Sequence, residues 1–269
     1  MASTIRVRWL YEACYEIEMA NGQHILTDPD LRIHKLPGFS EEMIERVDYL
    51  LLTHPHFDHT SDIGWICEKF HPKFMVGELA AMPICRFFNL SFADIYPVGN
   101  GDVMDFGDAK FEFLRGRHTK IQDPERGRPK ATLQTTIRNF GIEGHGECDQ
   151  FGWIENYQFL ITTNDNFRIM MVSGLSENLE LYRAAERFRP NLLIRQACMP
   201  TPGDYADEII RYRAPLVLPH HHEKIERRWH TDFSESEKSV RAELASRGSA
   251  IEFHFPEQFR WYEISLGLR

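Results

Sequence analysis

Apolar and polar residues alternate with a period of two in several short stretches of this chain, which is the pattern of half-buried β-strands. Near the N-terminus two such stretches flank Asn21-Gly22, a dipeptide typical of tight hairpin turns. Later apolar runs are bounded by glycine, proline, asparagine or aspartate and predict further strands. The expected strands cover residues 5–10, 14–19, 24–27, 49–52, 74–76, 94–98, 103–106, 110–115, 157–163, 167–173, 192–198, 216–218, 251–254 and 260–264.

Segments with apolar residues three or four positions apart predict helices between these strands. The expected helices cover residues 40–46, 61–70, 79–88, 177–188, 205–212 and 234–246. In the first of them we place Ser40 as the N-cap, with Glu41 and Glu42 in the first turn, where carboxylates are favourable. Strands mixed with helices in both halves predict an α/β fold in which two sheets pack together and helices lie outside.

Neither a hinge-like linker nor a repeat of solenoid length interrupts this pattern, so we expect a single domain over residues 1–269. One stretch lacks periodicity, because residues 118–152 are rich in glycine and carry several basic side chains. Loops of this length commonly serve as lids or binding loops. We therefore expect residues 118–152 to form a loop at the active site.

The segment with the most chemical information follows the predicted strand 49–52 directly and reads Thr-His-Pro-His-Phe-Asp-His. Imidazole and carboxylate are ligands of zinc and related divalent metals. His54 and His56 share a face in an extended segment, since side chains two apart point the same way. Asp58 and His59 follow at a turn and can address a second point, so the pattern predicts a pair of adjacent metal ions. A plain surface loop is the alternative, but the buried strand before the motif favours a metal site.

Composition narrows the classes of function. The chain has 269 residues, of which 42% are hydrophobic, and this is enough for a full core. A net charge of −9 argues against a broad nucleic-acid or membrane surface, so we expect neither as a partner. The five cysteines are scattered, and the N-terminus shows no signal-peptide pattern or membrane span. We expect a soluble cytoplasmic protein without disulfides.

The histidine motif resembles that of the metallo-β-lactamase-fold hydrolases, and most closely a cytoplasmic branch that includes ascorbate-6-phosphate lactonase-like enzymes. The resemblance extends from the first strands to the region near His221 and is strongest at residues 53–59. It implies an αββα four-layer sandwich, with two mixed sheets flanked by helices and a metal site at one edge between the sheets.

The same resemblance implies ligands outside the motif. His118 follows the predicted strand 110–115, where the family has its third histidine for the first metal. His220, His221 and His222 follow the predicted strand 216–218, where the family uses one histidine for the second metal. In relatives the ligand is often followed two residues later by an acid, so we choose His221, with His220 as the runner-up.

Of two aspartate positions of the family, this chain keeps one and replaces the other. Asp28 ends the predicted strand 24–27 and would hold the histidine loop by accepting hydrogen bonds, although a simple Asp-Pro turn is an alternative. The aspartate that bridges both metals in many relatives is replaced by Leu175, which cannot bind a metal. Two sites with three protein ligands each still result. The expected sets are His54, His56 and His118 for the first metal, and Asp58, His59 and His221 for the second.

We therefore expect one or two divalent metals per chain, with zinc first and manganese or iron as alternatives. A metal-bound hydroxide would attack the substrate, and Asp58 would anchor the second metal and orient this nucleophile. Basic residues around the expected loop, with Arg195 at the end of a strand, are candidates for substrate binding. They are Arg117, Lys120 and Arg195.

These points predict a cytoplasmic metal-dependent hydrolase that acts on a small anionic ester or lactone. A phosphodiesterase or nuclease of the same fold is one alternative. A non-catalytic metal-binding scaffold is another, because Leu175 stands where the bridging aspartate is expected. The resemblance also allows a homo-oligomer.

Overall fold

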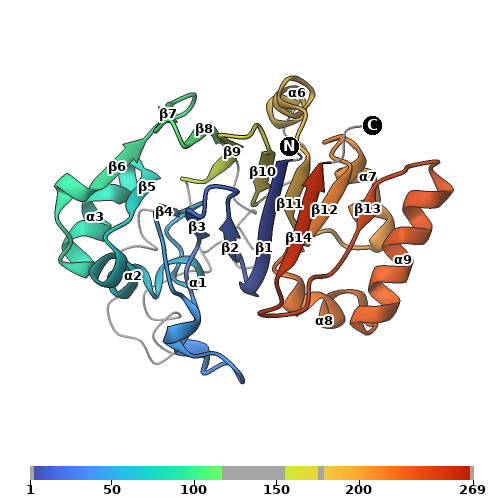
Figure 1. The fold of residues 1–269 in the computed structure, drawn as a ribbon. Coiled ribbons are helices and arrows are strands. Elements are labelled where there is room, and N and C mark those ends of the chain that lie inside the picture. The colour runs from blue at the N-terminus through green and yellow to red at the C-terminus, as the bar shows by residue number, and fades with distance from the viewer. Residues whose placement is uncertain (1–2, 117–154, 175–178, 267–269) are drawn as a thin grey trace, which may run out of the picture.

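Two β-sheets pack face to face in the computed structural model, with helices on both outer sides (Figure 1). The structure describes residues 3–116, 155–174 and 179–266. The predicted α/β fold, an αββα four-layer sandwich of two mixed sheets, is confirmed. The loop expected at residues 118–152 lies outside the described residues.

The first sheet has the strand order β14-β1-β2-β3-β4-β5-β6 among the described residues. Its strands are β1 (Ser3–Tyr11), β2 (Cys14–Glu18), β3 (His24–Thr27), β4 (Tyr49–Leu51), β5 (Lys73–Gly77), β6 (Ile95–Val98) and β14 (Tyr262–Leu266). Pairing is antiparallel from β14 to β3 and parallel from β3 to β6. The predicted hairpin turn is present, with Gly22 at φ +77° and a 2.8 Å hydrogen bond from the Met19 N–H to the Gln23 carbonyl.

The second sheet has the order β13-β12-β11-β10-β9-β8-β7 within the same described ranges. Its strands are β7 (Val103–Asp105), β8 (Ala109–Arg115), β9 (Tyr157–Thr163), β10 (Arg168–Val172), β11 (Leu192–Gln196), β12 (Leu216–His220) and β13 (Glu252–Phe253). It is antiparallel from β7 to β10 and parallel from β10 to β13. Both sheets are therefore mixed.

Helices cover the outer face of each sheet (Figure 1). On the side of the first sheet lie α1 (Phe57–Thr60), α2 (Ile63–Phe70), α3 (Glu78–Phe88) and the short 3-10 turns η1 (Arg32–His34), η2 (Glu41–Met43) and η3 (Phe92–Asp94). On the side of the second lie η4 (His222–Lys224), α6 (Leu179–Phe188), α7 (Pro202–Ile210), α8 (Ile225–Trp229) and α9 (Phe233–Ser246). None of the described helices has the length and apolar character needed to cross a bilayer.

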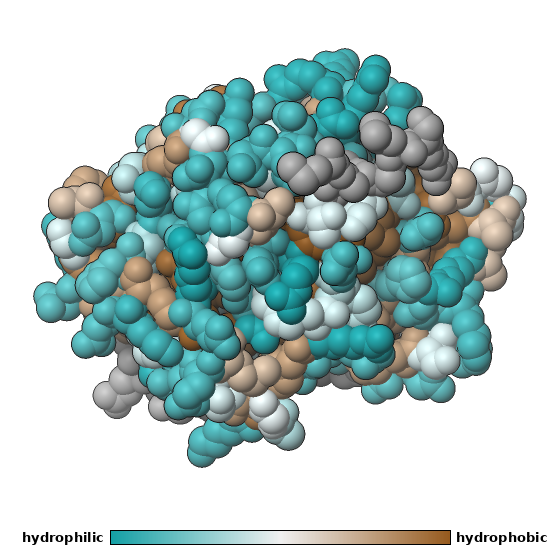
Figure 2. Space-filling model, in the orientation of Figure 1, coloured by the Kyte–Doolittle hydropathy of each residue, from teal (hydrophilic) through white to brown (hydrophobic). Residues whose placement is uncertain are grey.

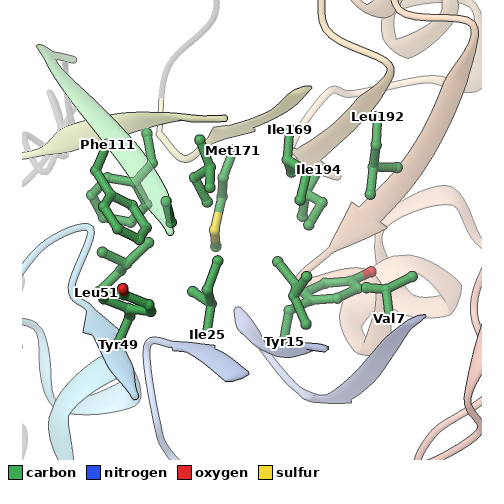
Figure 3. Close-up of a cluster of buried hydrophobic side chains, with 14 of the residues drawn as sticks. Val7, Tyr15, Ile25, Tyr49, Leu51, Phe111, Ile169, Met171, Leu192 and Ile194 are labelled. Atoms are coloured by element: carbon green, nitrogen blue, oxygen red, sulfur yellow. The ribbon is translucent and has the colours of Figure 1, made fainter. Parts of the chain in front are cut away.

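The main core lies between the two sheets (Figure 3). Ile25 and Leu51 point from the first sheet towards Met171 and Ile194 of the second, and all four are fully buried. Residues one position away along the strands turn outward and meet the helices, as Leu193 does. Each large apolar side chain contributes roughly 1.5–3 kcal/mol when buried. The face drawn in Figure 2 is mainly hydrophilic, with smaller apolar areas, as expected for a chain whose apolar positions face inward.

The helix predicted at residues 40–46 is wrong, because only the three-residue turn η2 forms there. The Ser40 side chain makes no capping hydrogen bond, and Ile44 already has extended backbone angles of φ −92° and ψ 102°. Ile44 and Val47 are both buried in the cluster beneath α2 and α3. Tertiary burial of these two side chains in an extended segment overrides the local helical signal. The hydrophobic pattern of the sequence also did not predict the short helix α8.

The carboxyl ends of the parallel strands position the polar loops. Asp28 follows β3, and the histidine motif follows β4 in the neighbouring strand of the same sheet. In the second sheet, Ser173 follows β10 and His221 follows β12. Loops after parallel strands commonly carry ligand sites, because their strands are held rigidly by both neighbours. The candidate site is built from these loops.

Candidate metal centre

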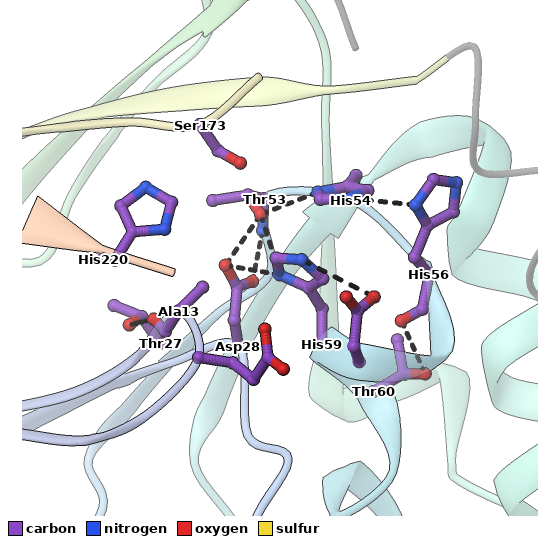
Figure 4. Close-up of polar contacts among 12 residues, drawn as sticks. Ala13, Thr27, Asp28, Thr53, His54, His56, His59, Thr60, Ser173 and His220 are labelled. Carbon is purple, nitrogen blue, oxygen red and sulfur yellow. Dashed lines mark hydrogen bonds and ion pairs between the residues drawn. The ribbon is translucent and has the colours of Figure 1, made fainter. Parts of the chain in front are cut away.

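The histidine loop is held in shape by backbone and hydroxyl contacts. His56 has extended backbone angles and ends the loop as the residue before α1. Its carbonyl accepts hydrogen bonds from the His59 N–H at 3.0 Å and from the Thr60 hydroxyl at 3.0 Å. The side chains of His54 and His56 lie together, with His54 Nε2 and His56 Nδ1 3.1 Å apart (Figure 4). The two-residue spacing therefore brings these imidazoles together.

Asp28 lies beneath this loop and is fully buried. Its carboxylate accepts from the Thr53 N–H at 2.7 Å and from the Thr53 hydroxyl at 2.7 Å (Figure 4). The same carboxylate is 2.9 Å from His59 Nδ1. An Nδ1–H that donates to a carboxylate leaves the Nε2 lone pair available for a metal. Asp28 thus fixes both the tautomer and the direction of the His59 ring.

A second carboxylate does the same for His221. The His221 Nδ1 donates to the Glu12 carboxylate, and the His221 backbone N–H donates to the Glu12 carbonyl at 2.9 Å. Both residues have positive φ angles, 46° for Glu12 and 54° for His221. Such angles are uncommon outside glycine and asparagine and recur where surrounding contacts hold a functional residue in place. The His221 Nε2 consequently lies 3.3 Å from the His59 Nε2.

Asp58 completes a three-residue cluster. One donor atom each from Asp58, His59 and His221 lie within 4.8 Å of one another. These side chains come from α1 and from the segment after β12, so the cluster joins both sheets. Two imidazole nitrogens and one carboxylate oxygen form a donor set that suits zinc, manganese or iron. The residues present fit a divalent metal.

The charges in the cluster are coupled. Burial alone would raise the pKa of Asp58, but nearby His59 and His221 hold it below its ordinary value. Burial alone would lower the pKa of His221, yet its hydrogen bond to Glu12 and the charge of nearby Glu223 raise it to about 10, so a bound metal would displace a proton from this ring. Asp58 is therefore a carboxylate at neutral pH, as a metal ligand must be.

The three consecutive histidines have different surroundings. His221 alone enters the cluster with Asp58 and His59. His220 is fully buried, and its Nε2 is 3.0 Å from the Val172 carbonyl. His222 stacks on Phe255 with the ring centroids 5.3 Å apart and the planes at 11°. Burial lowers the pKa of His222 to about 3, so this ring is neutral.

Arg195 is placed in the core rather than on a surface open to substrate. Its side chain is fully buried and lies on the α7 side of β11, with Nε 3.4 Å from the Glu208 carboxylate. Tyr212 also donates to Glu208, at 3.1 Å. These contacts describe a buried ion pair that ties β11 to α7. The other predicted site residues, His118, Arg117, Lys120 and Leu175, lie outside the described residues.

Sequence reasoning missed Glu12 and Lys224. Lys224 donates to the Glu12 carboxylate at 2.7 Å, and its side chain is 42% exposed. Glu12 is 209 positions from His221 along the chain, so no spacing rule connects them. The available signal was an acidic residue in the short turn between two apolar strands, β1 and β2.

Part of the chain is similar in sequence to known proteins. The family model described as the metallo-beta-lactamase superfamily matches residues 7–123. A UPF0173 metal-dependent hydrolase of Aeropyrum pernix is 36% identical over 100 residues, which cover 35% of this chain and 40% of the relative. Another, from Koribacter versatilis, is 35% identical over 69 residues, covering 26% and 30%. The matches to these two relatives therefore span less than half of either protein.

The structural likeness extends further along the chain. The solved structure of Igni18, a metallo hydrolase from the archaeon Ignicoccus hospitalis, superposes with a TM-score of 0.70. It is 13% identical in sequence and covers 98% of this chain and 100% of its own. An identity this low supports the fold alone. Residues 7–123 thus match the model of the metallo-β-lactamase superfamily, the chain has the two-sheet fold of such proteins, and part of its sequence is similar to UPF0173 metal-dependent hydrolases.

Proposed function

We propose that this chain is a metal-dependent hydrolase that cleaves a small anionic ester or lactone. The observation that carries the proposal is the cluster of Asp58, His59 and His221, in which each imidazole has its Nδ1 on a buried carboxylate. Paired carboxylate–histidine arrangements of this kind are typical of metal ligands and cost energy to assemble without one.

Asp58, His59 and His221 would hold one divalent ion, and zinc suits their donor set. His54 and His56, with His118, are our proposal for a second ion. When bound, such an ion lowers the pKa of a coordinated water towards neutrality and so supplies a nucleophile for an ester carbonyl. The role of Asp28 and Glu12 is to keep the two Nε2 lone pairs directed at the cluster.

The position of Lys224 supports the proposal that the substrate is anionic. Its ammonium group lies beside Glu12, is partly exposed, and has its pKa raised in part by Asp58, so it stands at the edge of the cluster. Burial alone would lower that pKa, but the neighbouring carboxylates raise it above the ordinary lysine value, so the group is charged at neutral pH. A cytoplasmic location is also part of the proposal, supported by the net charge of −9 and by four described cysteines that are all free.

The test begins with metal content. Protein purified without chelator and then reconstituted with zinc should contain one or two ions per chain by elemental analysis. Metal-loaded protein would then be screened against lactones, carboxylic esters, thioesters and phosphodiesters, and we expect turnover of a lactone or ester. Turnover of phosphodiesters alone would replace our proposal with phosphodiesterase activity. A chain that retains no metal would refute the proposal that this protein is a metal-dependent enzyme.

A matched pair of histidine variants separates the metal centre from general damage. His59→Ala should lose at least about 100-fold in turnover and one equivalent of metal, since even the partners of metal ligands contribute 10–100-fold. His254→Ala is the control, because its side chain is 47% exposed and the residue follows β13. Equal activity of the two variants would remove His59 from the site.

A further inference from the structure

Three polar residues form a row at the carboxyl ends of β10, β11 and β12. Gln196 is paired in register with His220, and Val172 with Arg195, so Ser173 is level with both. The residues two positions earlier on each strand belong to the core between the sheets. Because side chains alternate along a strand, Ser173 and His220 face the same inner space as that core. The polar row therefore lies between the sheets, at the edge that carries the metal centre.

The Ser173 hydroxyl is buried and aimed at this space. Its residue is 1% exposed, and the hydroxyl has no hydrogen-bond partner among the residues the structure describes. The backbone of Ser173 is fixed on both sides by Gln158, which accepts from its N–H at 2.5 Å and donates to its carbonyl at 2.9 Å. Figure 4 shows the hydroxyl directed towards Thr53, next to the histidine loop.

The His220 ring borders the same space. Its Nε2 donates to the Val172 carbonyl at 3.0 Å, so the ring reaches across β11 to the residue that precedes Ser173. A ring that donates through Nε2 has a bare lone pair on Nδ1. This Nδ1 is buried and, within the described part of the chain, accepts no hydrogen bond.

Both of these buried polar atoms lie on the inner face of the second sheet and require a partner, because native structures rarely leave such atoms unpaired. The His220 Nδ1 can only accept, so the partner must donate a hydrogen bond. A carboxylate, phosphate or apolar group would leave it unpaired. The Ser173 hydroxyl can donate or accept and so adapts to the same partner. A neutral hydroxyl satisfies both atoms.

We propose that Ser173 and His220 bind a hydroxyl group of the substrate beside the metal centre, so that the preferred substrate is a hydroxylated ester or lactone. This inference rests on the proposed function for the ester, and it adds the group that the protein recognises. A bound water could supply the same hydrogen bond, and the experiment distinguishes the two sources.

The probes are pairs of carboxylates that differ by one hydroxyl: 3-hydroxypropionate with propionate, and glycolate with acetate. Their binding to zinc-loaded protein is measured by calorimetry. We expect wild type to bind the hydroxylated member of at least one pair about fivefold to tenfold more tightly, the worth of one net hydrogen bond. Ser173→Ala and His220→Phe should reduce that preference below about twofold with unchanged zinc content.

Ser236→Ala is the matched control, since the Ser236 hydroxyl on α9 is also buried and has no described partner. It should keep the wild-type preference. Equal binding of both members of each pair by wild type, or no binding of either, would overturn the proposal and leave a water as the partner. A preference that survives in both variants would also overturn the proposal, because the bound metal alone would then account for recognition of the hydroxyl group.

The two variants guard against a folding artefact, since Ser173→Ala removes a single oxygen atom and should fold even if His220→Phe does not. Binding is measured without turnover. A protein that shows the expected preference and its loss, yet hydrolyses no ester or lactone, would refute the proposed function and leave standing the binding of a hydroxyl group by Ser173 and His220.

Discussion

Replacement of Glu12 by glutamine tests the metal centre most directly. Glu12 is 4% exposed, and its carboxylate accepts hydrogen bonds from His221 Nδ1 and from the Lys224 ammonium group. Glutamine has nearly the same size but carries no charge, and only its carbonyl oxygen can accept. The variant therefore keeps the packing and weakens the group that makes His221 a strong ligand.

The expected loss can be estimated in two ways. A hydrogen bond to a charged group contributes about 1.5–3 kcal/mol, and part of this is retained by the amide oxygen. Partners of metal-bound histidines typically contribute 10–100-fold in metal affinity, equivalent to about 1.4–2.7 kcal/mol. We expect Glu12→Gln to bind zinc about 30-fold more weakly at the Asp58–His59–His221 cluster.

The assay is a competition titration of metal-free protein with zinc against a chelating dye. Glu18→Gln is the control, because Glu18 pairs with Arg6 at the surface and its side chain is 26% exposed. The thermal midpoint of each metal-free variant shows whether the fold is intact. Zinc affinity of Glu12→Gln within threefold of wild type, with both midpoints unchanged, would refute the assignment of Glu12 as the partner of His221.

Three further predictions concern the surroundings of the site. Arg195→Met should lower the free energy of unfolding by about 3–5 kcal/mol and leave zinc content unchanged, because Glu208 loses its buried partner. Arg213→Met is the control: the Arg213 side chain is 69% exposed, so this change should lower the free energy of unfolding by less than about 1 kcal/mol. A substrate-binding role for Arg195 would instead show as lost activity at normal stability. Glu155→Gln should lower the free energy of unfolding by about 1 kcal/mol, since this carboxylate accepts hydrogen bonds from the Leu79 and Ala80 N–H groups at the start of α3, at 3.1 and 3.0 Å. Urea unfolding measures this free energy, and an unchanged value would show that the cap is dispensable. Burial lowers the pKa of His222 to about 3 in the folded state, so the unfolded chain, with a value near 6.5, takes up the proton first and stability falls as pH drops from about 6.5 towards 3. His222→Phe can keep the stack on Phe255, and between pH 7 and pH 5 its free energy of unfolding should fall by about 2 kcal/mol less than that of wild type. If the stability of both proteins changed in parallel with pH, the lowered pKa would be contradicted.

Most strands could be predicted from the sequence because their pattern is local. The alternation in β1 to β3 and the Asn21-Gly22 turn require only neighbouring residues, and β3 and β9 end where the pattern ends. The helix expected at residues 40–46 failed for a reason that no local pattern contains. Burial of Ile44 and Val47 beneath the first sheet fixes an extended backbone there.

The histidine motif could be identified from the sequence because four side chains able to bind a metal lie within a few residues of one another. His54 and His56 come together through the two-residue period of an extended chain, and Asp58 and His59 through the first turn of α1. Local geometry is enough to place these four. It is not enough to say which groups from elsewhere meet them.

Tertiary structure decided the rest. His221 meets His59 only because β4 and β12 belong to two sheets that pack face to face, and 162 positions separate the two residues. Glu12 becomes the partner of His221 because the turn after β1 reaches the same edge. Arg195, a candidate substrate contact by sequence, is directed by strand alternation towards α7 and Glu208. The sequence by itself determined the strands and the histidine loop, because both depend on neighbouring residues. The set of side chains that surrounds the loop depends on how the sheets pack, and no local pattern records that packing.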